Sequence, residues 1–153
     1  MSGDLALRFV SKLLRFDLAI DRNDLATDEG LETALAVSLF TDAPARAGDA
    51  LPVGLTDRRG WWGDEFAENP GDVAGSRLWL LDREKMTPDV LARSRIYAAE
   101  ALEWLVTDKV AASVDVVVTF DRASASRSYA VTIRRPGGDV ADYRFPKVWS
   151  AVK

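Results

Sequence analysis

The sequence contains no histidine and no cysteine. Without these residues, Ser-His-Asp and Cys-His catalytic arrangements are impossible, and zinc has neither imidazole nor thiolate ligands. A disulfide framework is excluded as well, which is consistent with a reducing compartment. Nucleotide-binding motifs are also missing, since no Walker loop and no Gly-x-Gly-x-x-Gly segment follows a strand pattern. We therefore expect neither a metal ion nor a cofactor.

Long apolar runs are missing too. No stretch of about 18 apolar residues could span a membrane, and the apolar segment that begins at Leu5 is broken by Arg8, Lys12 and Arg15. This segment is a poor candidate for a signal peptide. We expect a protein that is made and kept in the cytosol and has no membrane partner.

The chain has 153 residues, of which 48% are hydrophobic and 29% charged, as is usual for one globular domain over residues 1–153. Its net charge of −4 is unevenly spread: residues 1–121 hold 13 Lys and Arg against 22 Asp and Glu, and residues 122–153 hold 7 against 2. The basic end could orient the molecule against a partner, or its arginines could alternate on a solvated strand face. The overall acidity argues against a nucleic-acid partner.

The first part of the chain predicts a strand followed by a helix. Residues 16–20 have the period-2 pattern of a half-buried strand, whereas residues 4–14 fit either a strand or a helix. Thr27 is a candidate helix cap, with two acidic residues in the first turn, and the helix should end near Asp42, before Pro44. Its expected apolar stripe consists of Leu31, Ala34, Leu35, Ser38 and Leu39.

Residues 43–76 form a glycine- and proline-rich segment without helix or strand periodicity. A loop of this length is far above the usual median of about 4–6 residues, so it is either functional or disordered. Its bulky aromatic residues, Phe66 among them, argue against disorder.

The second half predicts a long helix and a three-strand meander. Thr87, Pro88 and Asp89 are typical of a helix start, and the apolar stripe continues for about 18 residues. Leu91, Ala98, Leu102 and Leu105 form that stripe, widened by Tyr97, Ala101 and Trp104.

Strand patterns follow at 114–120 and 129–134, and a shorter third strand is expected around 143–145, with Val148 and Trp149 at an edge. The fold class predicted is α+β, with two main helices packed on a mostly antiparallel sheet, a C-terminal three-strand meander and a long Gly/Pro/Trp-rich central loop.

The central loop supplies the candidate site. Arginine and tryptophan are the residue types that most often anchor protein–protein contacts, and this region concentrates them. The candidate partner-binding residues are Arg58, Arg59, Trp61, Trp62, Arg77 and Trp79. An alternative is that the tryptophan rings fold back onto the core, with Arg58 or Arg59 in cation–π contact; a mixed case would bury one ring and leave another for a partner.

Carboxylates supply the catalytic alternative, because a glycosidase works with a pair of Asp or Glu side chains. The candidate pairs come from Asp64, Glu65 and Glu68 in the loop, and from Glu100 and Glu103 on the long helix. With 24 acidic residues in the chain, chance pairs are expected. Solvated acids or ion-pair partners of Arg95 and Lys109 are the alternative interpretation, and catalytic residues are not predicted.

Five motifs in order resemble the Mu-like phage baseplate protein family. They are residues 24–34 (DLATDEGLETA), 38–42 (SLFTD), 57–64 (DRRGWWGD), 75–81 (GSRLWLL) and 97–106 (YAAEALEWLV). The resemblance covers residues 16 to about 149. The family is similar to the contractile-tail baseplate wedge proteins, in which a helix ends in a Thr-containing turn and is followed by an arginine-bearing loop, a long helix and strands; Thr41, Asp42, residues 59–63 and residues 88–106 fit this outline.

The resemblance implies a non-enzymatic structural subunit of a phage contractile-tail baseplate. Its partners would be other wedge and tail proteins, in a hetero-oligomeric assembly with six-fold symmetry, and its place would be the virion tail after synthesis in the host bacterial cytoplasm. Wider relatives carry Glu-Pro-Arg after the long helix where this chain has Thr107, Asp108 and Lys109, so that contact is not transferred. Some are labelled lysozyme-like, which would instead imply a carboxylate-dependent peptidoglycan hydrolase.

Overall fold

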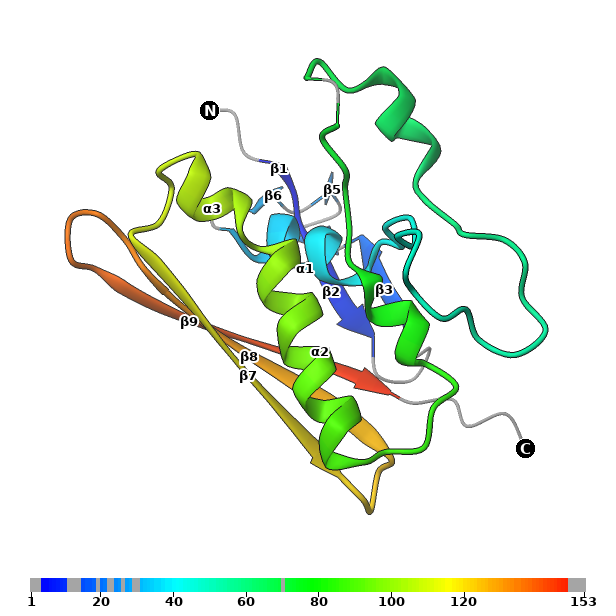
Figure 1. Ribbon diagram of the computed structural model, residues 1–153. Coiled ribbons are helices and arrows are strands. Elements are labelled where there is room, and N and C mark those ends of the chain that lie inside the picture. Colours follow the sequence, from blue (N-terminus) through cyan, green and yellow to red (C-terminus); the bar gives the residue numbers. More distant parts are fainter. Residues whose placement is uncertain are drawn as a thin grey trace.

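The computed structural model consists mainly of a three-stranded sheet with helices against one face (Figure 1). It describes residues 4–10, 15–18, 20–21, 24–25, 27–28, 31–69 and 71–148. The antiparallel strands β7 (Ser113–Asp121), β8 (Ser126–Arg134) and β9 (Val140–Val148) lie in the order β7-β8-β9. Helices α1 (Glu32–Phe40) and α2 (Pro88–Ala101) share a core with one face of this sheet. The predicted α+β class is therefore confirmed.

The meander buries every second side chain of its central strand. Tyr129, Val131 and Ile133 are fully buried on the helix-facing side, and the register pairs Val131 with Val116 of β7. The third strand was predicted to be short, and this was wrong, because β9 is as long as its neighbours. Pro146 does not end it, since β9 is an edge strand and a proline there needs no ladder partner on its outer side.

Helix α2 begins as predicted. The Thr87 side chain accepts a hydrogen bond from the backbone N–H of Val90, and Pro88 occupies the first turn. One arginine of this helix, Arg93, forms two parallel bonds with Glu84 and so ties the preceding loop to the helix. The side chains that α2 buries are Val90, Ser94 and Ala98.

The prediction of one helix of about 18 residues was wrong. Helix α2 ends at Ala101, and a separate short helix, α3 (Trp104–Thr107), follows. Between them the backbone tightens to i→i+3 hydrogen bonds, such as those from Leu102 N–H to Ala99 and from Leu105 N–H to Leu102. Residues three apart eclipse in such a turn, so Leu102 and Leu105 are both buried completely.

The first helix starts later than predicted. Thr27 is not its cap, because Thr27 and Asp28 form strand β6 (Thr27–Asp28), which pairs with β1 (Asp4–Leu5). Helix α1 begins at Glu32 and ends at Phe40, close to the expected end. Of its predicted stripe, Leu35 and Leu39 are buried and the other members are half-buried. The N-terminal pairing thus competes successfully with local capping.

The segment 4–14 fitted either a strand or a helix; its residues 4–10 are extended, and residues 11–14 lie outside the described residues. Strand β2 (Leu7–Val10) pairs with β3 (Arg15–Leu18), and β4 (Ile20–Asp21) pairs with β5 (Asp24–Leu25). The described residues of the strand predicted at 16–20 are extended, as expected, but they are divided between β3 and β4, which belong to different sheets. Trp149 lies outside the described residues, so its predicted edge position is not tested.

The central loop between α1 and α2 contains two 3-10 helices, η1 (Trp62–Phe66) and η2 (Arg77–Leu81). The described residues between Ala43 and Gly75 contain no α-helix and no β-strand. Figure 1 shows that η1 lies on a loop that projects away from the main body, whereas η2 packs beside α2. No helix of the described residues has the length and apolarity needed to cross a membrane.

Candidate protein-binding site

The six predicted partner-binding residues do not form one surface. Trp61 and Trp62 are exposed, whereas Trp79 and Arg77 are buried. Arg58 and Arg59 lie at the surface, but their guanidinium groups bind other parts of this chain. The structure therefore separates two regions, which we call the aromatic arm (residues 61–69 and 71–74) and the arm base (the residues around Arg59, Arg77 and Trp79).

Trp79 is the centre of the arm base. Only 2% of the residue is exposed, and its indole N–H donates a hydrogen bond to the carbonyl of Ala43 at 2.7 Å. The guanidinium of Arg59 lies over the indole, 4.5 Å from the ring centroid, and also pairs with Asp42 at 2.6 Å. One alternative interpretation of the sequence placed Arg58 or Arg59 over tryptophan rings folded back onto the core. Such a cation–π contact exists, but on Trp79 and not on the Trp61–Trp62 pair.

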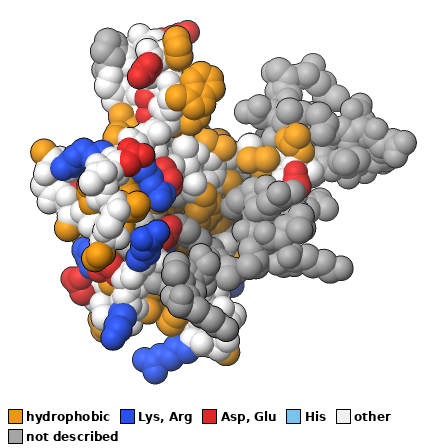
Figure 2. Space-filling model, turned by 90° about the vertical axis from the view of Figure 1, so that its right-hand side faces the viewer, with side chains coloured by type: hydrophobic (Ala, Val, Ile, Leu, Met, Phe, Trp, Pro, Cys, Tyr) orange, Lys and Arg blue, Asp and Glu red, His pale blue; other side chains and the backbone are white. Residues whose placement is uncertain are grey.

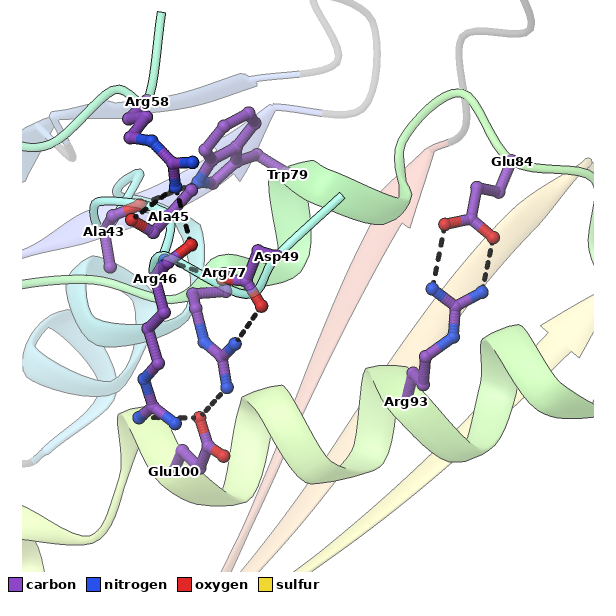
Figure 3. A network of polar contacts seen from close by, with 10 residues as sticks. All are labelled: Ala43, Ala45, Arg46, Asp49, Arg58, Arg77, Trp79, Glu84, Arg93 and Glu100. Carbon is purple, nitrogen blue, oxygen red and sulfur yellow. Dashed lines mark hydrogen bonds and ion pairs between the residues drawn. The ribbon is translucent and has the colours of Figure 1, made fainter. Parts of the chain in front are cut away.

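The guanidinium of Arg58 holds two segments of the central loop together. Arg58 donates to the backbone carbonyl of Arg46 at 2.6 Å, and the backbone N–H of Ala45 donates to the carbonyl of Arg58 at 2.8 Å (Figure 3). Arg59 has a positive φ of 55°, which is costly for a residue with a Cβ. Its contacts with Asp42 and Trp79 hold it in that conformation.

Arg77 joins the loop to helix α2. Its guanidinium pairs with Asp49 at 2.7 Å and with Glu100 at 2.6 Å, and it lies 4.3 Å from the centroid of the Tyr97 ring. Arg46 approaches the same Glu100 carboxylate at 3.3 Å, as Figure 3 shows. Since only 10% of the Arg77 side chain is exposed, this network is an internal connection.

The network sets the protonation of Asp49. Burial alone would raise the pKa of this carboxyl, but hydrogen bonds from the backbone N–H of Arg46 and from the Arg77 side chain outweigh burial and lower the pKa. The carboxylates of Glu100 and Asp49 raise the pKa of Arg77, against the effect of its burial. The charged state is therefore the stable state of this connection.

The arm carries a preformed aromatic cluster. The Trp61 and Trp62 ring centroids are 5.7 Å apart, and Phe66 meets Trp62 edge-on at 6.1 Å. A Cβ at Gly63 would lie 2.3 Å from the Trp61 ring, so glycine lets that ring fold over the backbone. Trp62 and Phe66 remain 73% and 76% exposed, and Trp61 45%.

Hydrogen bonds within this chain hold the arm and its neck in place. The Asp64 carboxylate accepts a hydrogen bond from Ala74 N–H at 3.0 Å, which joins the outgoing and returning chains. At the neck, Gly75 has a φ of +98°, and a Cβ there would lie 2.3 Å from the carbonyl oxygen of Thr41. Ser76 and Thr41 are hydrogen-bonded at this point, so the motif that begins at residue 75 starts with glycine for a steric reason.

A pocket of about 290 Å³ opens between the neck of the arm and α2. Tyr97 and Trp104 form aromatic walls, and Arg46, Arg77 and Glu100 supply the charged groups. Glu100 is the one carboxylate that lines this pocket in the described part of the chain, and two guanidiniums already bind it. The pocket therefore does not provide the pair of carboxylates that glycoside hydrolysis requires.

The remaining candidate acids lie apart from this pocket. Asp64 serves the arm closure, and Glu65, Glu68 and Glu103 are exposed. The suggested ion pair of Arg95 is replaced by a hydrogen bond to the carbonyl of Val116. No group of three His, Cys, Asp or Glu residues that could hold a metal ion occurs among the residues described.

Sequence reasoning missed the acidic partners of the arginines. Asp42, Asp49 and Glu100 are 17, 28 and 23 residues away from the arginines they bind, so no local pattern reveals them. The partners of a buried arginine were missed in the same way: Arg127 of β8 donates to Asp82 at 2.8 Å and to Ser94 of α2 at 3.0 Å. Its position in the alternating pattern of β8 is the only available signal, because it falls on the buried face.

Comparison with known proteins matches most of this chain. A family model described as phage protein GP46 matches residues 31–140. Baseplate protein gp46 of Escherichia phage Mu is 44% identical over 138 residues, which cover 90% of this chain and 92% of that protein. Mu-like prophage FluMu protein gp46 of Haemophilus influenzae is 35% identical over 134 residues, covering 88% and 90%. The resemblance to the Mu-like phage baseplate family is thereby confirmed.

Proposed function

This chain belongs to the phage protein GP46 family, and from that premise we propose that it is a structural subunit of a phage tail baseplate. The observation that carries the proposal is its 44% identity to a baseplate protein of phage Mu over nearly the full length of both chains. Its location is then the tail of the virion, and its partners are other baseplate proteins.

The finer part of the proposal is a position in the baseplate wedge, close to the sheath, within a hetero-oligomeric assembly of six-fold symmetry. Support comes from the order of elements that this chain shares with contractile-tail wedge proteins: a helix, an arginine-bearing loop, a long helix and strands. Residues 107–109 differ from those wedge proteins, so the contact made there by the relatives is not included.

The mechanism that we propose is mechanical. Trp61 and Trp62 are the residues that contact neighbouring subunits, while Arg58, Arg59, Arg77 and Trp79 hold the arm base in place. Because the base is internally bonded, the aromatic cluster is presented in one arrangement, and a partner need not order it upon binding. Removal of a base residue should therefore weaken folding, and removal of an arm residue should weaken assembly.

The experiment uses a tail-producing strain in which the gene is deleted and supplied in trans with an affinity tag. Tails purified from this strain should contain the tagged protein, and the deletion alone should give no complete tails. The W61A/W62A variant should fold as a monomer yet fail to enter particles. V117A, which removes an exposed apolar side chain of β7, is the matched control and should assemble normally.

Two results would contradict the proposal. Complete tails that form without the gene, or that lack the tagged protein, would overturn the baseplate role. Clearing of purified peptidoglycan by the protein, lost on changing Glu65, Glu68, Glu100 or Glu103 to Gln, would favour the hydrolase instead.

A further inference from the structure

The charge of the exposed arm is opposite to what its arginine-rich flank suggests. The arm contains four carboxylates, Asp64, Glu65, Glu68 and Asp72, and neither lysine nor arginine. The arginines that precede and follow it are bound by acids and carbonyls of this same chain. A partner that reaches the arm therefore meets carboxylates and aromatic rings.

Figure 2 shows this composition at the surface. The projecting end of the molecule, at the top of the view, carries orange and red side chains, and the blue side chains begin below it. Within the described part of the chain, Glu65 and Glu68 form no ion pair, and both are exposed. Their negative charge is thus available to a partner.

The aromatic rings favour the same kind of partner. Trp62 and Phe66 are about three-quarters exposed. An exposed indole face attracts a guanidinium or ammonium group through cation–π contact, and the carboxylates of the same arm can add ion pairing. The exposed rings also offer apolar surface to the stems of such side chains. An acidic partner surface would be repelled by four nearby carboxylates.

From this geometry we propose that the aromatic arm binds a basic, partly apolar surface of another baseplate protein, with Lys or Arg side chains of that protein lying against Trp62 and Phe66. This inference rests on the proposed function, since it assumes that the chain is in the baseplate. The four carboxylates exclude nucleic acid as the occupant for electrostatic reasons. Arg58, Arg59 and Arg77 are not contacts of the partner here but supports of the arm base.

The test places a photo-crosslinking phenylalanine analogue at Phe66 in the tagged protein, within assembled tails. After irradiation, the crosslinked peptide is identified by mass spectrometry. The expected peptide belongs to another tail protein and has more Lys and Arg than Asp and Glu. A crosslinked peptide without that excess, a crosslink to lipid or to a second copy of this chain, or no crosslink at all would overturn the inference.

Charge variants provide the second measurement. E65K/E68K reverses two exposed charges of the arm. E103K/D115K makes the same charge change at two exposed positions elsewhere: Glu103 immediately precedes α3, and Asp115 lies in β7. The arm variant should lower the crosslink yield by about tenfold or more, because like charges then meet, while the control keeps the yield within about twofold. Equal yields would contradict the inference.

The two proposals fail in different ways. If the unmodified tagged protein is missing from purified tails, the baseplate role itself fails. If the protein is present in tails but the Phe66 crosslink or its charge dependence is not as expected, only the assignment of a basic partner surface fails.

Discussion

The guanidinium carbon of Arg59 lies 4.5 Å from the centroid of the Trp79 ring, although the two residues are twenty positions apart in the chain. The same guanidinium pairs with Asp42 just after α1. One side chain thus connects the end of a helix, the entry to the arm and η2. Trp79 beneath this side chain is buried, whereas Trp61 and Trp62 are exposed.

The first prediction concerns this contact. R59A should lower the free energy of unfolding by about 0.5–1 kcal/mol, since a surface cation–π contact and an exposed ion pair are both lost. R59K should recover part of the loss, because it keeps the charge but not the planar group. Urea unfolding measures both, and an unchanged midpoint for R59A would show that the contact does not stabilise the base.

A second prediction contrasts two tryptophans. W79A should lower the free energy of unfolding by about 3–5 kcal/mol, because it removes a buried ring and its hydrogen bond to Ala43. W62A should change it by no more than about 0.5 kcal/mol, as expected for an exposed side chain. Chemical unfolding compares them. Similar losses for both variants would mean that Trp62 belongs to the core.

A third prediction uses two glycines with nearly the same backbone angle. Gly71 and Gly75 have φ values of +96° and +98°, but a Cβ has open space at Gly71 and meets the Thr41 carbonyl at Gly75. G71A should cost about 1–2 kcal/mol from strain alone. G75A should cost clearly more, since backbone must move, and thermal unfolding should rank the two variants in this order. The reverse order would contradict the close approach at the neck.

The fourth prediction concerns the stability of the fold at acidic pH. The pKa of Asp49 lies below its ordinary value of 3.8 in the folded protein, so the unfolded state takes up the proton first as pH falls. The stabilisation is complete above pH 3.8 and is lost as pH falls through the folded pKa. The difference in unfolding free energy between the wild type and D49N should therefore shrink in this range. D115N controls for the loss of one charge, and a difference independent of pH would contradict the linkage.

The fifth prediction concerns the stability of the fold at alkaline pH. Burial raises the pKa of Tyr129 from 10.0 to about 12, against the opposing effect of Arg127. Tyr129 ionises less readily in the folded state than in the unfolded state, which stabilises the folded state as long as the tyrosine is neutral. This stabilisation is complete below pH 10 and is lost as pH rises through about 12. Unfolding free energies over this range should fall more steeply for the wild type than for Y129F. Equal slopes would show that Tyr129 ionises as readily when folded.

The parts that sequence predicted well depend on neighbours along the chain. Thr87 and Pro88 start a helix by local capping. The β-branched run identifies β7, and the alternation of residues 129–134 identifies β8, because one side of a sheet is buried. Thr27 shows the limit, since its hydroxyl and following acids favour a cap locally. Pairing with Leu5, at the far end of the N-terminal segment, decides that it is a strand residue.

The sequence by itself determined the α+β class, the meander and the concentration of arginine and tryptophan in the central loop. Only the tertiary structure decided which of these side chains face outward. An arginine that the sequence offers as a partner contact can instead form ion pairs within its own chain, as Arg77 does with Asp49 and Glu100. Ion pairing depends on distance in space, and that distance is set by packing. Only folding therefore decides that the arginines are bound internally while the acidic and aromatic side chains of the arm stay exposed.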